Sequence, residues 1–177
     1  MPALIVIARP SAGEFAESTG TYIARVPGDD AWPVLVAQAG EVDHLLGSIP
    51  EERALHRYAP GKWSVKEVVG HLSDAERIYA YRALRFARDD ATSLPGFEEN
   101  LYVPAGRFNL RPTGELLEEW RAVRAATLAL YRGLDGQALL RRGVANGNGI
   151  SVRALAWVAA GHTLHHLGVL RERYGVR

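Results

Sequence analysis

The segment from Val152 to Leu170 is apolar around almost its whole circumference when it is drawn as a helix. One broad side carries valine, leucine and alanine together with three histidines, and the other side carries Trp157, Leu164 and Leu167. A helix without a polar face has to be buried. The segment therefore predicts a central helix surrounded by other helices, and Ser151 is the residue type that caps such a helix.

Two glycines lie inside this predicted helix. Gly161 and Gly168 each cost roughly 1 kcal/mol relative to alanine in a helix interior. We expect the close approach of another helix, or room for a ligand, to offset that cost.

Three more segments have helical periodicity. Residues 30–47 and 113–134 repeat apolar residues at spacings of three and four, and Asp29 or Asp30 can cap the first of them. The segment 64–88 has the clearest start, because Ser64 followed by Glu67 is a capping-box pattern.

The connections between these helices differ in length. Residues 89–112 form a long connection punctuated by proline and glycine, which permits a crossover between helices that are not neighbours. Residues 146–149, with the sequence NGNG, predict a turn.

Together these elements predict an all-α fold, a four-helix up-down bundle with a long crossover loop, in one domain over residues 30–177. Residues 1–29 contain scattered proline and glycine, so we expect an irregular N-terminal arm that packs across the outside of the domain. A short strand at residues 4–7 is the alternative for the arm, although it has no obvious partner.

The composition excludes several classes of protein. At 177 residues the chain fits one domain, and a net charge of +1 gives no polybasic surface for nucleic acid. Cysteine is absent, which removes disulfides, zinc–thiolate sites and a cysteine nucleophile and fits a reducing compartment. No stretch approaches the ~18 apolar residues of a membrane span. We expect a cytoplasmic protein with a small-molecule substrate and without nucleic-acid or membrane binding.

Histidines on two predicted helices form a candidate metal site. His162 and His166 are one helical turn apart on the last helix, so both rings project from the same face. His71, on the helix over 64–88, can supply a third neutral nitrogen, and three ligands with an open position are typical of a catalytic metal site. His165 is the alternative partner of His162. The remaining two histidines, His44 and His56, lie in polar surroundings and are predicted to be at the surface.

A divalent metal held by three neutral imidazoles keeps its double charge, so it would acidify a bound water or hold a thiol as thiolate. Asp74 and Glu76 follow His71 by about one turn and are the candidate bases, although for Asp74 an exposed structural role is as plausible. Histidine ligands suit zinc, nickel, copper or iron, so the pattern does not select the metal. Burial of the three histidines without a metal is the other interpretation.

Several motifs resemble those of the DinB-like superfamily, particularly its YfiT-like branch. They are YAPGKWSVKEVVGHLSDAER at 58–77, LPGFEEN at 94–100, RGVANG at 142–147 and SVRALAWVAAGHTLHH at 151–166. The resemblance implies a four-helix bundle that binds nickel or zinc through one histidine of the second helix and a His-x-x-x-His pair of the last helix. Here those positions are His71, His162 and His166. It also implies frequent homodimers.

The resemblance leaves the reaction open, since members are described as metal-dependent hydrolases or as enzymes that use bacillithiol, mycothiol or glutathione. The first hypothesis is transfer of a low-molecular-weight thiol to an electrophile. The alternatives are hydrolysis by a metal-activated water and a non-catalytic dimeric stress protein that binds a ligand or a metal. A shared fold does not decide between them.

Overall fold

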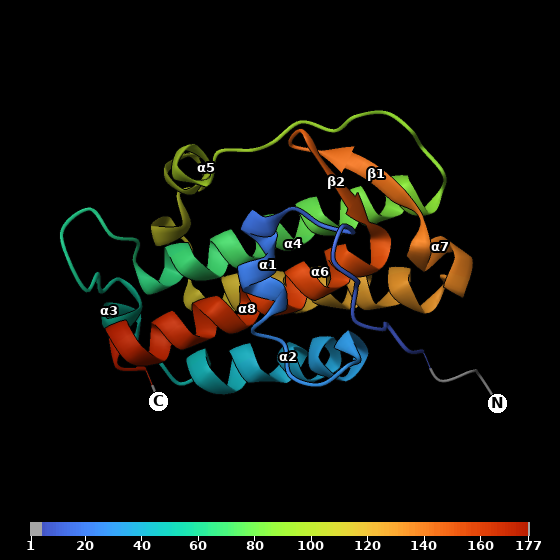
Figure 1. The fold of residues 1–177 in the computed structure, drawn as a ribbon. Helices are drawn as coiled ribbons and strands as arrows, with labels where there is room; N and C mark the ends of the chain where they lie inside the picture. Colours follow the sequence, from blue (N-terminus) through green and yellow to red (C-terminus); the bar gives the residue numbers. More distant parts are fainter. Residues whose placement is uncertain (1–4, 177) are drawn as a thin grey trace.

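Four long helices form the bundle in the computed structural model, which describes residues 5–176 (Figure 1). They are α2 (Ala31–Leu46), α4 (Val65–Ala87), α6 (Thr113–Arg132) and α8 (Val152–Tyr174). Helix α8 packs against both α4 and α2, and α6 packs against the same two helices from the other side. The predicted all-α four-helix bundle is therefore confirmed, with helix ends within a few residues of the predicted ones.

Side-chain caps start three of these helices where the sequence predicts them. The Ser64 hydroxyl accepts a hydrogen bond from the Glu67 amide at 3.1 Å, and the Glu67 carboxylate accepts one from the Ser64 amide at 2.7 Å. Asp30, and not Asp29, caps α2, while Ser151 caps α8. Each cap satisfies a backbone N–H that the first turn of a helix leaves without a partner.

The long connection returns the chain along the bundle. Helices α4 and α6 consequently run in the same direction, and α2 and α8 run in the opposite one (Figure 1). This crossover contains α5 (Glu99–Gly106) and the 3-10 helix η1 (Phe108–Leu110). It joins two helices that pack against each other, so the length of the connection serves the return along the bundle and not a link between distant helices.

Short elements complete the described chain. They are α1 (Glu17–Ile23), α3 (Glu51–Ala54), α7 (Gly136–Leu140) and an antiparallel hairpin of β1 (Arg142–Ala145) and β2 (Asn148–Ser151). The predicted turn at residues 146–149 is realised at Asn146 and Gly147, which both have positive φ and form the tip of the hairpin, while residues 148 and 149 already belong to β2.

The N-terminal arm is more ordered than predicted. It contains α1, and its residues Ile7, Ile23 and Val26 are buried in the core. Of the alternative strand at residues 4–7, residue 4 lies outside the described residues and residues 5–7 form no strand. The sequence predicts an irregular arm because its apolar residues show no helical period. A few apolar side chains can nevertheless be buried in a core without such a period, and their burial orders the arm.

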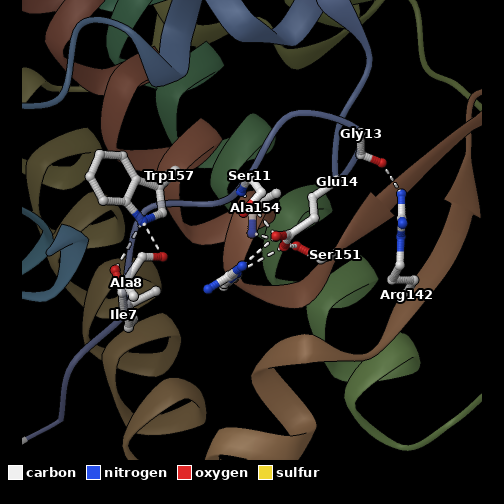
Figure 2. A network of polar contacts seen from close by, with 10 residues as sticks. Ile7, Ala8, Ser11, Gly13, Glu14, Arg142, Ser151, Ala154 and Trp157 are labelled. Atoms are coloured by element: carbon white, nitrogen blue, oxygen red, sulfur yellow. Dashed lines mark hydrogen bonds and ion pairs between the residues drawn. The ribbon is translucent and has the colours of Figure 1, made fainter. Parts of the chain in front are cut away.

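Polar contacts fix the arm to the first turn of α8 (Figure 2). The Trp157 indole N–H donates to the Ile7 carbonyl at 2.9 Å. The Glu14 carboxylate accepts hydrogen bonds from Arg153 Nε at 2.8 Å and from the Ser151 hydroxyl at 2.8 Å. The arm is thus anchored to the helix that carries two of the predicted metal ligands.

Helix α1 touches α8 at Gly161. A Cβ added at Gly161 would lie 2.0 Å from the backbone carbonyl oxygen of Tyr22, so no side chain fits there. This confirms close helix approach as the reason for Gly161, whereas Gly168 has no such neighbour within 4 Å. Within residues 5–176, no helix is both long enough and apolar enough to cross a membrane.

Candidate metal centre

The three predicted ligands converge in the interior of the bundle. His71 on α4 and His162 and His166 on α8 each offer a ring nitrogen, and these nitrogens all lie within 4.8 Å of one another. His71 Nε2 and His162 Nε2 are 3.0 Å apart. All three side chains are buried, with exposed fractions of 5%, 4% and 9%.

Burial keeps these imidazoles neutral. Burial, with a smaller contribution from the positive charge of His165, lowers the pKa of His71 to about 4. Burial is also the main reason why the pKa values of His162 and His166 lie well below the usual value for histidine. A neutral imidazole presents a free lone pair, which is the form that binds a metal.

The donor set fits a divalent metal. Zinc–histidine bonds of about 2.0–2.1 Å in a tetrahedral site place neighbouring nitrogens roughly 3.3 Å apart. The one short separation, 3.0 Å between His71 Nε2 and His162 Nε2, is close to that value, and no pair in the group is more than 4.8 Å apart. Three buried, uncharged rings point nitrogens toward one another, and a cation among them would accept the lone pair of one nitrogen on each ring.

Aromatic side chains surround the rings. Tyr22 of α1 and Tyr79 of α4 meet the His162 ring edge-on at centroid distances of 5.4 and 5.6 Å. Trp63 lies 4.7 Å from the His71 ring and stacks at 6.4 Å on His166. Burial raises the pKa values of both tyrosines, so their hydroxyls remain protonated and can donate hydrogen bonds.

A buried polar network lies behind His162. Arg124 of α6 donates to the Gln38 side chain at 2.9 Å and to the Thr163 hydroxyl at 3.1 Å, and Gln38 donates to the Ala160 carbonyl at 2.8 Å. Two positions of α8 that flank His162 are therefore held by α2 and α6. Such fixed surroundings restrict the movement of a ligand side chain.

Cavities open on both sides of the histidines. A cavity of about 230 Å³ reaches His71 and His162, and it is walled by α1, α4, the start of α5, the hairpin and α8. A second one, of about 270 Å³, reaches His165 and His166 beside Trp63. We call the first the hairpin-side cavity and the second the Trp63-side cavity.

The two predicted bases lie away from the histidine cluster. The Glu76 carboxylate is 2% exposed and pairs with Arg124, with 2.9 Å between Oε1 and Nε and a hydrogen bond of 3.2 Å from Nη2 to Oε2. Asp74 lies 3.7 Å from Arg77, and burial raises its pKa. Neither residue lines either cavity. Their catalytic roles remain untested predictions without support from this geometry.

The other histidines follow the sequence interpretation. His44 and His56 are exposed. His165 is half-buried, and its ring lies 5.0 Å from that of His166. Its nitrogens are not part of the three-histidine group, so it forms a cavity wall.

The sequence interpretation did not identify most of the cavity walls. Tyr22, Tyr79, Arg82, Glu99 and Asn148 all line the hairpin-side cavity. Tyr79 and Arg82 follow His71 by eight and eleven residues on α4, so the three residues share a face of that helix. This spacing is the sequence feature from which the two wall residues could have been predicted. Tyr22, Glu99 and Asn148 come from short elements that have no periodic pattern.

The model of the DinB superfamily matches residues 35–170, a span that contains all three histidines. The chain belongs to the DinB superfamily. The match leaves the N-terminal arm outside, so Tyr22 lies beyond the segment that defines the family. No curated protein is significantly similar to the chain.

A solved structure has the same fold. It is YfiT from Bacillus subtilis, described as "a probable metal-dependent hydrolase with an unusual four-helix bundle topology". The similarity covers 95% of this chain and 94% of YfiT with a TM-score of 0.74, at 17% sequence identity. At that identity the likeness concerns the fold, and the reaction has to be inferred from the site.

Proposed function

We propose that this DinB superfamily chain is a metal-dependent enzyme, with His71, His162 and His166 as the ligands of one nickel or zinc ion. The supporting observation is the convergence of three buried, neutral imidazoles beside a cavity that could admit a small molecule. The proposed reaction is transfer of a low-molecular-weight thiol to an electrophile. Three protein ligands leave a coordination position for that thiol.

When bound there, a divalent metal lowers the pKa of a coordinated thiol or water and so supplies a nucleophile at neutral pH. The protein residues supply position and hydrogen bonds. The rings of Tyr22 and Tyr79 pack against His162 and both residues line the cavity, where their protonated hydroxyls could donate to negative charge that develops on the electrophile. Leu155 and Val158 form an apolar part of the wall of the hairpin-side cavity, which limits the access of water to the histidines.

The distribution of carboxylates favours thiol transfer over hydrolysis. A free thiol has a pKa of about 8.5 and needs little help to lose its proton, whereas free water has a pKa of about 15.7 and, even on a metal, usually passes its proton to a nearby base. Among the described residues that line the hairpin-side cavity, Glu99 is the one carboxylate. Asp74 and Glu76 lie elsewhere, so the base that hydrolysis requires has fewer candidates.

Hydrolysis is the second candidate, because YfiT, which shares the fold, is described as a probable metal-dependent hydrolase. Cleavage of esters or amides without added thiol, abolished by a chelator, would support it. An obligatory thiol requirement would support transfer, and tight ligand binding without turnover of any substrate would support a non-catalytic binding protein.

The first experiment measures metal by elemental analysis in the parent and in His71→Ala, His162→Ala and His165→Ala variants, all expressed with added nickel or zinc. His165→Ala is the matched control, because it removes a neighbouring imidazole that lies outside the ligand group. We expect about one metal per chain in the parent and the control, and loss of metal in the other two.

Activity is then measured with monochlorobimane and a thiol such as bacillithiol or glutathione. Thiol-dependent turnover that is absent from His162→Ala and retained by His165→Ala supports the proposal. A parent that stays metal-free after reconstitution, or turnover that is unchanged in His162→Ala, refutes it.

A homodimer and a cytoplasmic location belong to the same proposal. The absence of cysteine fits a reducing compartment. Exposed apolar side chains, including Tyr81 and Leu84, lie in a shallow groove between the parallel helices α4 and α6, and this groove offers a surface for a second copy.

A further inference from the structure

The second cavity beside the histidines has no part in the proposed reaction. This Trp63-side cavity, of about 270 Å³, is walled by three aromatic side chains, Tyr58, Trp63 and Tyr174, and by the imidazoles of His165 and His166. An engineered apolar cavity of about 150 Å³ binds benzene, so the Trp63-side cavity has room for about two fused rings. Its walls and its size therefore suit a small molecule with a planar aromatic part.

The loop that carries Trp63 is held in place from two sides. The Tyr174 hydroxyl, at the end of α8, donates to the Trp63 carbonyl at 2.5 Å. Arg57 donates to the Lys62 carbonyl at 2.5 Å and pairs at 2.7 Å with Glu67, the acidic residue of the α4 capping box. The cavity is thus formed before any ligand binds, and a preformed pocket avoids the entropic cost of ordering a loop.

The rings of the cavity wall offer both kinds of aromatic contact. The Tyr58 and Tyr174 rings meet edge-on with 4.9 Å between their centroids, whereas the Trp63 and His166 rings are nearly parallel, at 21°. A planar ligand can stack on the face of one ring and meet the edge of another. Each such contact is worth about two- to tenfold in affinity beyond the burial of apolar surface.

The charge around the cavity favours an anion over a cation. Among the described residues that line it, Lys62 is the one lysine or arginine, and none is an aspartate or a glutamate. The hydrogen bonds of Lys62 and Trp63 involve their backbones, so within residues 5–176 the Lys62 ammonium and the Trp63 indole N–H have no acceptor. A carboxylate can accept from both donors, whereas a cation would meet no opposite charge and would be repelled by Lys62.

We infer that the Trp63-side cavity binds a planar aromatic carboxylate, with its ring against Trp63 and the tyrosines and its carboxylate toward Lys62. The site borders His166 but uses neither a metal nor a thiol. The inference therefore goes beyond the proposed function and stands even if that function is wrong.

The probe is 2-naphthoate, which has two fused rings and one carboxylate. Its binding to the full chain is measured by calorimetry, both with metal and after removal of metal by a chelator. Nuclear magnetic resonance follows the indole N–H signals of the four tryptophans, and a Trp63→Phe variant identifies the Trp63 signal by its loss. Two matched ligands are titrated in parallel: 2-naphthamide, which has the same shape without the charge, and 2-naphthyltrimethylammonium, which has the opposite charge.

We expect the Trp63 indole signal to shift when 2-naphthoate is added, while the signals of the other tryptophans stay in place, since none of them lines this cavity. The amide should bind about two- to fivefold more weakly than the acid, which is the size of an exposed charge pair, and the cation more weakly still. Binding should persist after chelation, because the carboxylate is not a metal ligand. These comparisons use the parent protein, so they hold even if a variant folds poorly.

Two variants with matched controls test the wall residues. Trp63→Leu should weaken binding of the acid about two- to tenfold, since it removes an aromatic face and keeps an apolar side chain. Trp32→Leu is its control, because Trp32 is also half-buried but lies outside the cavity. Lys62→Gln should weaken binding of the acid about two- to fivefold and leave the amide unaffected. Arg88→Gln, which removes an exposed charge at the other end of α4, should change neither.

Three results would overturn the inference: no binding of 2-naphthoate at millimolar concentration, binding that leaves the Trp63 signal unmoved, or an amide or cation that binds as tightly as the acid. Loss of binding on chelation would also overturn it, because the carboxylate would then be bound by the metal. Metal content and thiol-dependent turnover are separate measurements, so failure of this inference is distinguishable from failure of the proposed function.

Discussion

Replacement of Glu76 by glutamine should destabilise the protein strongly while leaving its chemistry intact. The substitution preserves the shape of the side chain but removes its charge. Arg124, whose side chain is 0% exposed, would then hold a positive charge inside the bundle without a counter-ion. Breaking a buried ion pair by removal of one partner typically costs about 3–5 kcal/mol.

The contacts that Arg124 retains place the expected loss in the free energy of unfolding at the lower end of that range, about 3 kcal/mol. Its guanidinium would still donate to the Leu35 carbonyl, the Gln38 side chain and the Thr163 hydroxyl, and it lies 4.7 Å from the centre of the Trp120 ring. For a chain of this size, 3 kcal/mol corresponds to a decrease in Tm of roughly 6–12 °C.

Urea unfolding at pH 7 measures the change, with Glu115→Gln as the matched control. Glu115 is a carboxylate on α6 whose side chain is 59% exposed and 3.8 Å from Arg111, so its loss should cost less than about 1 kcal/mol. A loss below about 1 kcal/mol in Glu76→Gln would refute the stabilising role of the pair. A folded Glu76→Gln variant with full metal and at least 100-fold lower turnover would instead restore Glu76 as the catalytic base.

Other perturbations test the arm, the site and the assembly. Gly161→Ala, whose Cβ would lie 2.0 Å from the Tyr22 carbonyl, should cost about 1–3 kcal/mol in urea unfolding despite the better helix propensity of alanine; unchanged stability would mean that α1 moves freely. Arg153 lowers the pKa of Glu14 to about 2, so this carboxylate stabilises the fold above pH 4.5 and the effect disappears as the pH falls toward 2. The stability gap between the parent and Glu14→Gln should therefore be smaller at pH 3 than at pH 7, and a constant gap would contradict the pairing. The metal should be released on acidification, because protons compete for the histidine nitrogens; dialysis with elemental analysis at pH 7 and pH 4 measures it, and full retention at pH 4 would argue against histidine ligation. Leu84→Glu should convert the proposed dimer to a monomer in sedimentation analysis, and a parent that sediments as a monomer would exclude this interface.

The sequence was sufficient to predict the long helices and the convergence of the three histidines for one physical reason. Both depend on periodicity within a single segment. The spacing of His162 and His166 fixes their common face whatever surrounds the helix. The caps at Ser64 and Ser151 likewise depend on residues three positions away, so local sequence contains the whole signal.

The rest of the site depends on contacts between distant residues. Glu76 looks like a candidate base because it follows His71 closely, but its environment is set by Arg124, which lies 48 residues later in the chain. The helical character of α1 is equally hidden, since its seven residues, ESTGTYI, include few strong helix formers, and packing of Ile23 and Tyr22 against α8 stabilises it.

The division between these two kinds of residue bears on substrate specificity. The three histidines proposed as metal ligands lie on α4 and α8, two long helices in extensive contact, and within the residues that the superfamily model matches. The charged and hydroxyl groups of the cavity wall come largely from α1, the crossover and the hairpin, which connect or precede the bundle helices. Connecting segments tolerate sequence change more readily than packed helices. If the proposed metal centre is correct, Tyr22 and Glu99 on the cavity wall, rather than the histidines, are therefore the positions at which substitutions should first change substrate specificity.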